Sequence, residues 1–457
     1  MPLSAIEHWL TYHIRLLLNE KFSVETLKKV AFIIALTSCI GAGFVSLISL
    51  YAEPWQTRLH YTSFQVNLIS GVSNLAGYLT PPILGMLSDS HGPVILSWMA
   101  FVGFVPSYFY LSYAFNNDNA QFLWSMISFA MIGISTSALF FSALLTCAKL
   151  YPKHKILSIS FPTTCYGISS LLGSQLLKNS YFWFDGQYLD LSKVFRFFAW
   201  FYTFVGLFTW VSTSIVSMLK LVVEEDEQRP LLEGAADMSP TKSAEYSVRI
   251  YEFLRDPSAY LLLLVMFLSL GPLEMFLTNM GSLSALIQPT SPTVQTKILS
   301  YYAASSTTAR ILVGLAVDFL TSRKISRIWI LYALLLTGAV AQLLIVVSTS
   351  APSLVFCASA LCGLAYGGLF TTCPTLTLTI WGDAVFGTAY GSFMIAPALG
   401  AAIYGILYAR VYDSGCYSGD STCIVAAFRL TFVSFITALG VSGVVYWGYW
   451  RRRKIDV

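Results

Sequence analysis

The sequence contains little charge for its length. Charged residues make up 11% of the 457 residues, whereas hydrophobic residues make up 56%. A soluble domain averages roughly 25% charged residues, so this chain has too little charge to solvate the surface of a water-soluble protein of its size. We therefore expect that most of its surface faces lipid rather than water.

Sequence motifs for enzymatic or nucleotide-driven chemistry are also missing. The chain contains no G-x-S-x-G, no H-E-x-x-H, no P-loop and no paired-cysteine metal pattern. All five histidines lie outside the long apolar segments. We expect no catalytic residues, no cofactor, no bound metal and no nucleic acid partner, and an ATP-driven pump is excluded for this chain.

A cleavable signal peptide is not predicted, because the first 29 residues carry seven charged side chains. Six of the eight cysteines lie inside apolar segments, where a thiol acts as a small hydrophobic group. Cys416 and Cys423 instead flank the polar loop YSGDST. They would form a disulfide if that loop faces an oxidising compartment; otherwise they stay reduced.

Long apolar runs are what the sequence has in abundance. A helix needs about 20 apolar residues to cross a bilayer, and twelve runs meet that length. They lie near residues 30–51, 64–88, 94–115, 121–148, 156–177, 195–219, 258–280, 298–320, 328–348, 354–381, 385–409 and 424–450. Because these runs are twice as long as β-barrel strands and continuously apolar, we predict an all-α membrane protein with twelve transmembrane helices.

The twelve runs divide into two similar sets of six. Gly85 and Asp89 end the second run, and Gly314 and Asp318 end the eighth, 229 residues later. A G-x-x-x-x-x-L-F pattern recurs in runs four and ten at nearly the same offset. The chain therefore reads as two pseudo-symmetric six-helix halves, 30–219 and 257–450, an architecture typical of secondary transporters.

The distribution of lysine and arginine predicts the orientation. If both termini face the cytosol, 19 of the 27 basic residues lie on the cytosolic side, 7 lie on the other side and Arg310 lies within the membrane. The cytosolic parts are then the tail 1–29, the linker 220–256 and the basic tail 451–457. The linker is acidic and rich in Gly, Pro and Ser, so we expect it to be largely disordered. We expect a monomer in the bilayer.

With twelve spans, a duplicated half and G-x-x-x-D before a cytosolic loop, the chain resembles the major facilitator superfamily. The signature loop G-x-L-x-D-R-x-G-R-[KR] of that family corresponds to GMLSDSHGPV and GLAVDFLTSRK here. The resemblance implies a conformational latch, and the matching positions are Gly85, Asp89, Gly92, Gly314, Asp318 and Arg323. Ser90 and Pro93 replace arginines in the first copy, and Thr321 replaces a glycine in the second, so the latch is weakened.

Longer stretches narrow the resemblance. ISLYAEPWQ, NLAGYLTPPILGMLSDSHGP, FPTTCYGISSLLGSQLL, LGPLEMFLTNMGSL and YGGLFTTCPTL are similar to the fungal monocarboxylate-transporter-homologue branch, which is close to plant nodulin-like carriers. The resemblance implies a transporter in the vacuolar membrane. The name of that branch does not by itself establish a monocarboxylate substrate.

Two charges lie well inside the apolar runs, Arg310 and Glu274. Each costs at least ~2.5–3.5 kcal/mol to insert. A guanidinium at mid-membrane can bind a substrate carboxylate through two hydrogen bonds, or it can join helices. Glu274 is a candidate proton carrier, or a carboxyl hydrogen-bonded to its neighbours. Related monocarboxylate carriers have an aspartate where Ser306 stands and a lysine in the first span, which this chain lacks.

Three tyrosines lie mid-span beside glycines and are candidates to line a substrate cavity: Tyr166, Tyr366 and Tyr390. Packing against neighbouring helices is the alternative for each. In the linker, Glu227, Leu231 and Leu232 match the acidic-dileucine signal [DE]-x-x-x-L-[LI], which vesicle adaptor complexes read. That match also favours delivery to the vacuole.

The sequence thus predicts a secondary transporter, and not an enzyme, that moves a small organic solute by alternating access. A monocarboxylate-like anion, with protons as the coupling ion, fits Arg310 and Glu274. One alternative is a non-transporting sensor or trafficking protein on a transporter scaffold, although sensors usually carry long cytosolic tails. Another is a metal or phosphate carrier, although cation carriers place several carboxylates in their spans.

Overall fold

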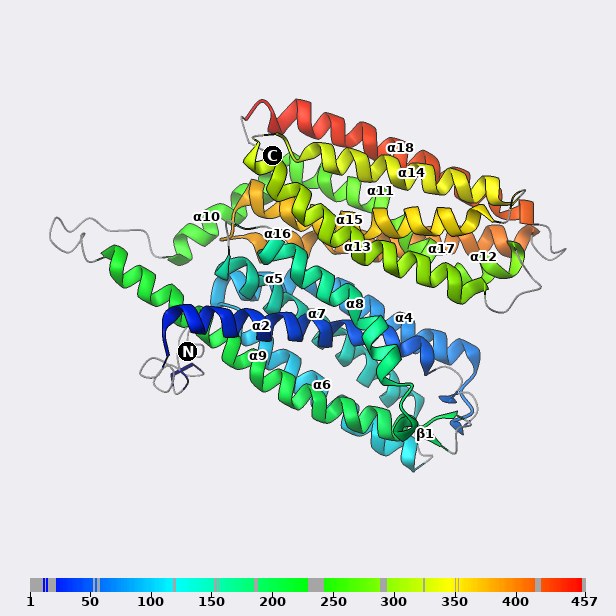
Figure 1. The fold of residues 1–457 in the computed structure, drawn as a ribbon, viewed down its shortest axis with the longest axis horizontal. Helices are drawn as coiled ribbons and strands as arrows, with labels where there is room; N and C mark the ends of the chain where they lie inside the picture. Colours follow the sequence, from blue (N-terminus) through cyan, green and yellow to red (C-terminus); the bar gives the residue numbers. More distant parts are fainter. Residues whose placement is uncertain are drawn as a thin grey trace. The chain divides into compact units, whose positions relative to one another are not determined.

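The computed structural model is almost entirely helical (Figure 1). It describes residues 11, 12, 14, 22–51, 54, 55, 58–117, 121–151, 154, 156–184, 188–228, 242–287, 294–323, 325–349, 351, 353–415 and 421–453. The chain forms two compact units. Unit 1 comprises Met1–Lys153, Ile168–Ile250 and Asp383–Ser392, and unit 2 comprises His154–Gly167, Tyr251–Gly382 and Phe393–Val457. Each unit thus contains a short segment from the other half of the sequence.

Eleven helices among the described residues are long and apolar enough to cross a membrane. The twelfth expected span, 64–88, is built from two shorter helices, α4 (Ser63–Leu79) and α5 (Pro81–His91). The helix is interrupted there because Pro81 and Pro82 have no amide hydrogen to donate to the helical hydrogen bonds. The predicted all-α membrane fold with twelve spans is confirmed in this form.

Unit 1 is a bundle of helices with one short pair of strands. Its helices are α2 (Val24–Gly43), η1 (Phe44–Leu50), α4, α5, α6 (Val94–Asn116), α7 (Phe122–Leu150), the later turns of α8 (Phe161–Leu176), η3 (Ser180–Phe182), α9 (Leu191–Gln228), the start of α10 (Lys242–Arg255) and nearly all of α16 (Phe386–Phe393). The strands β1 (Trp183–Phe184) and β2 (Tyr188–Leu189) form an antiparallel pair.

Unit 2 repeats the same packing. Its helices are η2 (Ile156–Ser160), the first turns of α8, the end of α10, α11 (Pro257–Thr278), α12 (Met280–Ile287), α13 (Val294–Ser322), α14 (Ile328–Ser348), α15 (Leu354–Trp381), α17 (Ile395–Gly415), η5 (Ser421–Ile424), α18 (Val425–Val445) and η6 (Tyr446–Trp450). The pairs α13–α15, α14–α15, α14–α18 and α11–α18 correspond to α4–α7, α6–α7, α6–α9 and α2–α9 of unit 1. The internal repeat of the sequence therefore also appears in how the helices pack.

Prolines that interrupt the ladder are compensated in the same way in both units. Pro81 cannot bond the carbonyl of Gly77 four residues earlier, and the Ser137 hydroxyl on α7 donates to that carbonyl instead. In α11, Pro272 leaves the carbonyl of Leu268, which accepts a 2.7 Å hydrogen bond from Ser434 Oγ on α18. In both places a hydroxyl from a facing helix thus donates to the carbonyl that the proline cannot bond.

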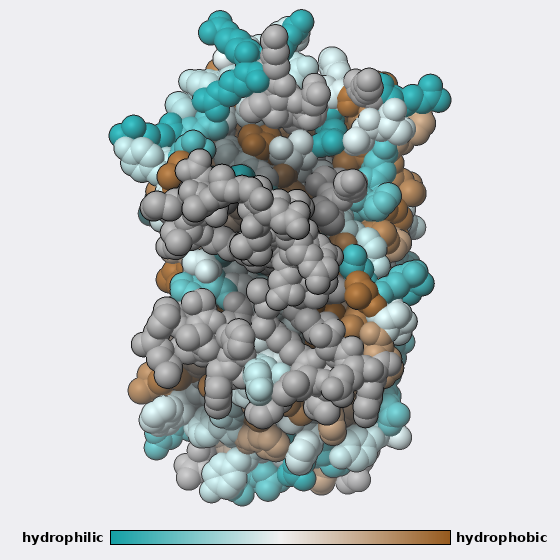
Figure 2. All heavy atoms as spheres, turned by 90° about the vertical axis from the view of Figure 1, so that its left-hand side faces the viewer, coloured by the Kyte–Doolittle hydropathy of each residue, from teal (hydrophilic) through white to brown (hydrophobic). Residues whose placement is uncertain are grey.

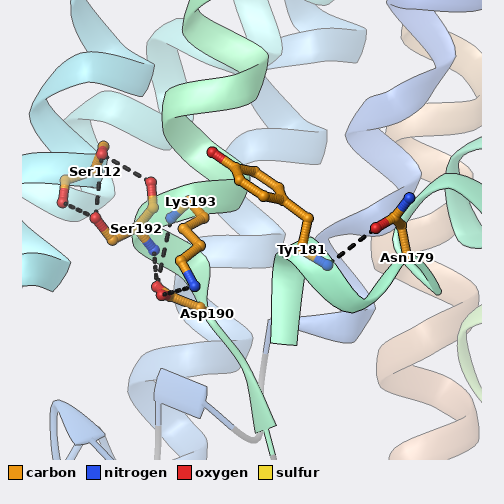
Figure 3. Close-up of polar contacts among 6 residues, drawn as sticks. All are labelled: Ser112, Asn179, Tyr181, Asp190, Ser192 and Lys193. Carbon is orange, nitrogen blue, oxygen red and sulfur yellow. Dashed lines mark hydrogen bonds and ion pairs between the residues drawn. The ribbon is translucent and has the colours of Figure 1, made fainter. Parts of the chain in front are cut away.

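The start of α9 is fixed by a small polar cluster (Figure 3). Asp190 Oδ1 accepts hydrogen bonds from the backbone N–H groups of Ser192 at 3.1 Å and Lys193 at 3.4 Å, and Lys193 Nζ lies 3.5 Å from Asp190 Oδ2. The Ser192 hydroxyl and the Ser112 backbone carbonyl on α6 are 3.1 Å apart. These contacts cap α9 and attach it to α6, so we assign them a structural role.

Candidate functional site

A buried polar face on α13 is the starting point of the site. Tyr302, Ser306 and Arg310 recur every four residues and therefore lie on one side of the helix. All three are buried, and Arg310 is only 5% exposed. This side of α13 therefore presents a guanidinium, a hydroxyl and a phenol to neighbouring helices rather than to lipid.

Arg310 is held from two sides. Its Nη1 donates a 3.1 Å hydrogen bond to the backbone carbonyl of Thr163, in the first turns of α8, and its Cζ lies 5.8 Å from the centre of the Phe370 ring on α15. Gly167 leaves room for the guanidinium, because a Cβ there would lie 3.1 Å from Arg310 Nε. Among the described residues, the buried Nε has no hydrogen-bond partner.

Glu274 and Tyr366 form the second part of the site. The Tyr366 hydroxyl on α15 donates a 2.9 Å hydrogen bond to Glu274 Oε1 on α11, and Glu274 is 6% exposed. Glu274 follows Pro272 by two residues, inside the continuous helix α11. The Tyr366 ring lies 4.7 Å from the Phe370 ring and 5.6 Å from the Tyr302 ring. Tyr366 and Phe370 therefore link the carboxyl to the guanidinium by direct contacts.

The structure brings three separately predicted residues, Arg310, Glu274 and Tyr366, into one cluster. Two members of the cluster, Phe370 and the carbonyl of Thr163, were not predicted from the sequence. Phe370 could have been found, because it stands one helical turn after Tyr366 in the repeated L-F pattern. The contact with Thr163 could not, because it joins positions 147 residues apart.

The other two predicted tyrosines have different surroundings. Tyr166 lies in the first turns of α8 in unit 2 and is partly buried. Tyr390 lies on α16 in unit 1 and is fully buried. Its ring stacks on Phe141 at 5.6 Å and on Phe386 at 5.8 Å. These contacts are those of a packed aromatic core, and contact of Tyr390 with substrate stays a prediction.

The first Gly-Asp motif packs against α16. Asp89 accepts hydrogen bonds from the backbone N–H of Gly387 at 3.1 Å and of Thr388 at 2.6 Å, so it caps the start of α16. Burial raises the pKa of Asp89 to about 6, although the hydrogen bonds from these amides and the charge of Lys149 favour the ionised form. The Tyr246 hydroxyl on α10 lies 3.0 Å from Thr388 Oγ1.

Glycines let the first motif approach α16 closely. A Cβ at Gly85 would lie 2.0 Å from the backbone oxygen of Gly387, so only glycine fits there. Gly92 ends α5 with a φ of 91°, a conformation that glycine adopts without strain.

The second Gly-Asp motif makes the equivalent contact in unit 2. Asp318 Oδ2 accepts a 3.3 Å hydrogen bond from the backbone N–H of Ile156 at the start of η2. A Cβ at Gly314 would lie 2.4 Å from the Ser160 side chain. Arg323 is exposed, with its Cζ 5.5 Å from the Phe319 ring. Both aspartates thus accept backbone hydrogen bonds at the start of a helical segment.

Several predicted positions lie outside the described residues. Leu231, Leu232 and Cys416 are among them, and Glu227 falls in the last turn of α9, where side chains are not described. Cys423 is disulfide-bonded, whereas Cys39, Cys147, Cys165, Cys357, Cys362 and Cys373 are free. The pairing of Cys423 with Cys416 stays a prediction. No cluster of three metal-ligating side chains occurs in the described part of the chain.

Comparison with known proteins gives matches along the whole chain. Residues 31–405 match the Major Facilitator Superfamily. The probable transporter MCH1 of Saccharomyces cerevisiae is 47% identical over 492 aligned residues, which cover 100% of both chains. The probable transporter MCH1 of Eremothecium gossypii is 47% identical over 461 residues, covering 99% of this chain and all of the relative.

Solved structures with the same fold are more distant in sequence. The proton:xylose symporter XylE superposes with a TM-score of 0.68 at 14% identity, covering 93% of this chain and 96% of that chain. The human organic anion transporter MFSD10 superposes with a TM-score of 0.61 at 16% identity, covering 92% and 100%. At these identities the likeness concerns the fold alone.

Proposed function

Because the chain belongs to the Major Facilitator Superfamily, whose members are membrane transporters and not enzymes, we propose that it is a secondary transporter of a small organic anion. Transport would proceed by alternating access across the vacuolar membrane. The single observation that carries the choice of an anion is Arg310, a buried guanidinium whose Nε lacks a partner among the described residues.

The Nε side of the Arg310 guanidinium, which has no hydrogen-bond partner among the described residues, favours a carboxylate group on the substrate. A guanidinium presents five N–H donors in a planar fork, and only Nη1 donates a hydrogen bond to a described residue, at Thr163. A carboxylate can accept from Nε and a neighbouring Nη in parallel. The Phe370 ring beside the guanidinium supplies an apolar surface for the carbon skeleton of a small substrate. Tyr166 and Tyr390 stay weaker candidates for contact with substrate.

Glu274 supports coupling to protons. A carboxyl buried in α11 next to Pro272 would exchange a proton when that helix bends. Its hydrogen bond from Tyr366, together with the ring contacts of Tyr366 and Phe370, links it to Arg310. Proton binding at Glu274 and anion binding at Arg310 would then influence each other.

The two Gly-Asp motifs are proposed as the conformational latch. Gly85, Asp89 and Gly92 would hold α16, and Gly314 and Asp318 would hold η2, in the state of the transporter that this structure represents. Arg323 is exposed beside Phe319, so its part in the latch would be electrostatic. Release of both contacts would accompany the change of state.

Two alternatives make different demands. A sensor on a transporter scaffold would not need a buried guanidinium whose Nε lacks a hydrogen-bond partner among the described residues. A metal carrier would need several carboxylates, and the described residues contain no metal-ligating cluster. The organic-anion carrier therefore accounts for more of the observed contacts.

Comparing the metabolite content of isolated vacuoles from cells with and without the protein tests the proposed function. We expect one or a few organic acids to change in vacuolar concentration, because cells without the protein lack the carrier that moves its substrate across the vacuolar membrane. Unchanged organic acids together with altered signalling would instead support the sensor.

The vacuolar location is tested separately through Glu227, Leu231 and Leu232. In a tagged protein, Leu231→Ala with Leu232→Ala should move most of the fluorescence from the vacuole to other membranes, because the adaptor complex binds both leucines. A matched control is Val222→Ala with Val223→Ala, which changes two apolar residues of the same linker and leaves the signal intact. An unchanged vacuolar location of the dileucine variant would contradict the assignment.

We also propose that the transporter is a monomer and that both of its termini lie in the cytosol.

A further inference from the structure

The C-terminal tail is bound to the corner between α10 and α11. Arg453 Nη1 forms a 2.9 Å ion pair with Asp256 Oδ2, and the Trp381 indole donates a 3.3 Å hydrogen bond to the same oxygen. Asp256 also caps α11 by accepting from the N–H of Ser258 at 3.0 Å. These contacts bring the arginines that follow η6 to the end of α10, and they leave the buried carboxylate of Asp256 already engaged.

Three guanidinium groups at this corner remain without a carboxylate. Arg255, Arg451 and Arg452 are exposed, and none forms an ion pair in the part of the chain that the structure describes. Arg255 lies over the Tyr251 ring at 4.1 Å, and Arg451 lies over the Trp447 ring at 4.3 Å. The corner therefore has an excess of positive charge next to aromatic rings.

The same corner exposes apolar side chains. Tyr251 is 52% exposed and Trp447 is 57% exposed, and Leu254 and Tyr260 are exposed to a similar degree. The Tyr260 hydroxyl on α11 donates a 2.7 Å hydrogen bond to the Leu254 backbone carbonyl, which links the exposed faces of α10 and α11.

The opposite face of α10 is anchored in unit 2. Phe253 is buried, 5.4 Å from the Trp381 ring and 6.0 Å from the Phe393 ring. The end of α10 is therefore amphipathic, with its outer face continuous with that of the membrane-spanning α11. Viewed from the left-hand side of Figure 1, hydrophilic side chains gather at the top of the molecule beside hydrophobic ones (Figure 2).

We propose that this surface, formed by Tyr251, Leu254, Arg255, Trp447, Arg451 and Arg452, binds the headgroups of anionic phospholipids. Arginines that reach from an aromatic belt toward the water layer are placed for phosphate groups, and clusters of basic residues next to a membrane helix attract anionic lipid. The acidic stretch EEDE of the linker is a competing occupant. The exposed Trp447 and Tyr251 rings favour lipid, because they match a headgroup–acyl boundary better than a solvated acidic peptide. The proposed orientation, with both termini in the cytosol, decides only which leaflet of the membrane supplies these lipids. The lipid-binding surface itself does not depend on it.

Native mass spectrometry of the purified full chain tests this surface, with phosphatidylserine titrated against a phosphatidylcholine background. Arg255→Gln, Arg451→Gln and Arg452→Gln together should weaken phosphatidylserine binding about 100-fold, because each arginine near an anionic surface contributes a factor of about five. The three corresponding lysine substitutions should retain most of the binding. Arg410→Gln with Arg429→Gln, which removes two exposed arginines elsewhere in unit 2, should leave it unchanged.

Unaltered phosphatidylserine binding in the triple glutamine variant would overturn the proposal. The proposal is also overturned if the triple variant still binds phosphatidylserine but its linker is cleaved more readily by protease. The arginines would then bind the acidic linker instead of lipid. If the triple variant does not fold, Arg452→Gln alone decides, with an expected loss of about fivefold. The assay contains no transport substrate, so its outcome is independent of the role proposed for Arg310.

Discussion

Arg310→Ala should reduce uptake of the transported anion at least about 30-fold at low substrate concentration. Truncating one partner of a buried, hydrogen-bonded charge pair costs about 2–5 kcal/mol, and each 1.4 kcal/mol is about tenfold in affinity. The measurement is initial uptake into vesicles of vacuolar membrane across a panel of organic acids.

A lysine at this position separates charge from geometry. Arg310→Lys keeps the positive charge but loses the planar fork and the Nε donor, so we expect uptake between those of Arg310→Ala and the wild type. Arg429→Ala, which removes an exposed arginine from the same unit, is the matched control and should behave as wild type. Wild-type uptake in a folded Arg310→Ala protein would assign Arg310 to joining α13 with α8 through Thr163 instead.

Gly85→Ala should destabilise unit 1 more than any other glycine-to-alanine substitution in that unit. The added Cβ would lie 2.0 Å from the Gly387 carbonyl oxygen and 2.8 Å from the Thr388 nitrogen. Because the obstructing atoms are backbone, α5 and α16 must separate, and Asp89 then loses its two amide donors. Overpacking alone costs about 1–3 kcal/mol, and the lost hydrogen bonds to a charged group add about 1.5–3 kcal/mol each.

Thermal unfolding of the purified protein measures this effect. Gly71→Ala is the control, because Gly71 lies in α4 and a Cβ there would meet no atom within 4 Å. That substitution should be neutral or stabilise the protein by about 0.5–1 kcal/mol, as expected for alanine in a helix interior. If both variants unfold at the wild-type temperature, α5 and α16 do not pack as closely as described.

The fold could be predicted from the sequence because its determinants are local. Apolar runs of helix length, the repeated Gly85–Asp89 spacing and the resemblance to the fungal branch sufficed for the family, and both levels of the resemblance are confirmed. The break in the second span was less evident. Proline often sits within a membrane helix, and here Pro106 lies inside α6 without ending it.

The candidate site was predictable only as separate residues. Arg310 and Glu274 stand out because charges are rare in membrane spans, but a residue count along each predicted span, at a rise of about 1.5 Å per residue, sets them ~10 Å apart in depth. Nothing in that count indicated that Tyr366 and Phe370 bridge the distance. Contacts of this kind depend on how α11, α13 and α15 rotate about their axes, which a single sequence does not encode in any short pattern.

The exchange of segments between the two units has a consequence for dissecting the protein. A fragment ending in the linker would contain Asp89 and Gly85 but not Gly387 and Thr388, which complete unit 1 from the other half of the chain. The complementary fragment would lack Thr163 and Ile156, so Arg310 and Asp318 would lose their hydrogen-bond acceptor and donor. The chain consists of two homologous halves, and we expect each unit to be complete only when both halves are expressed together.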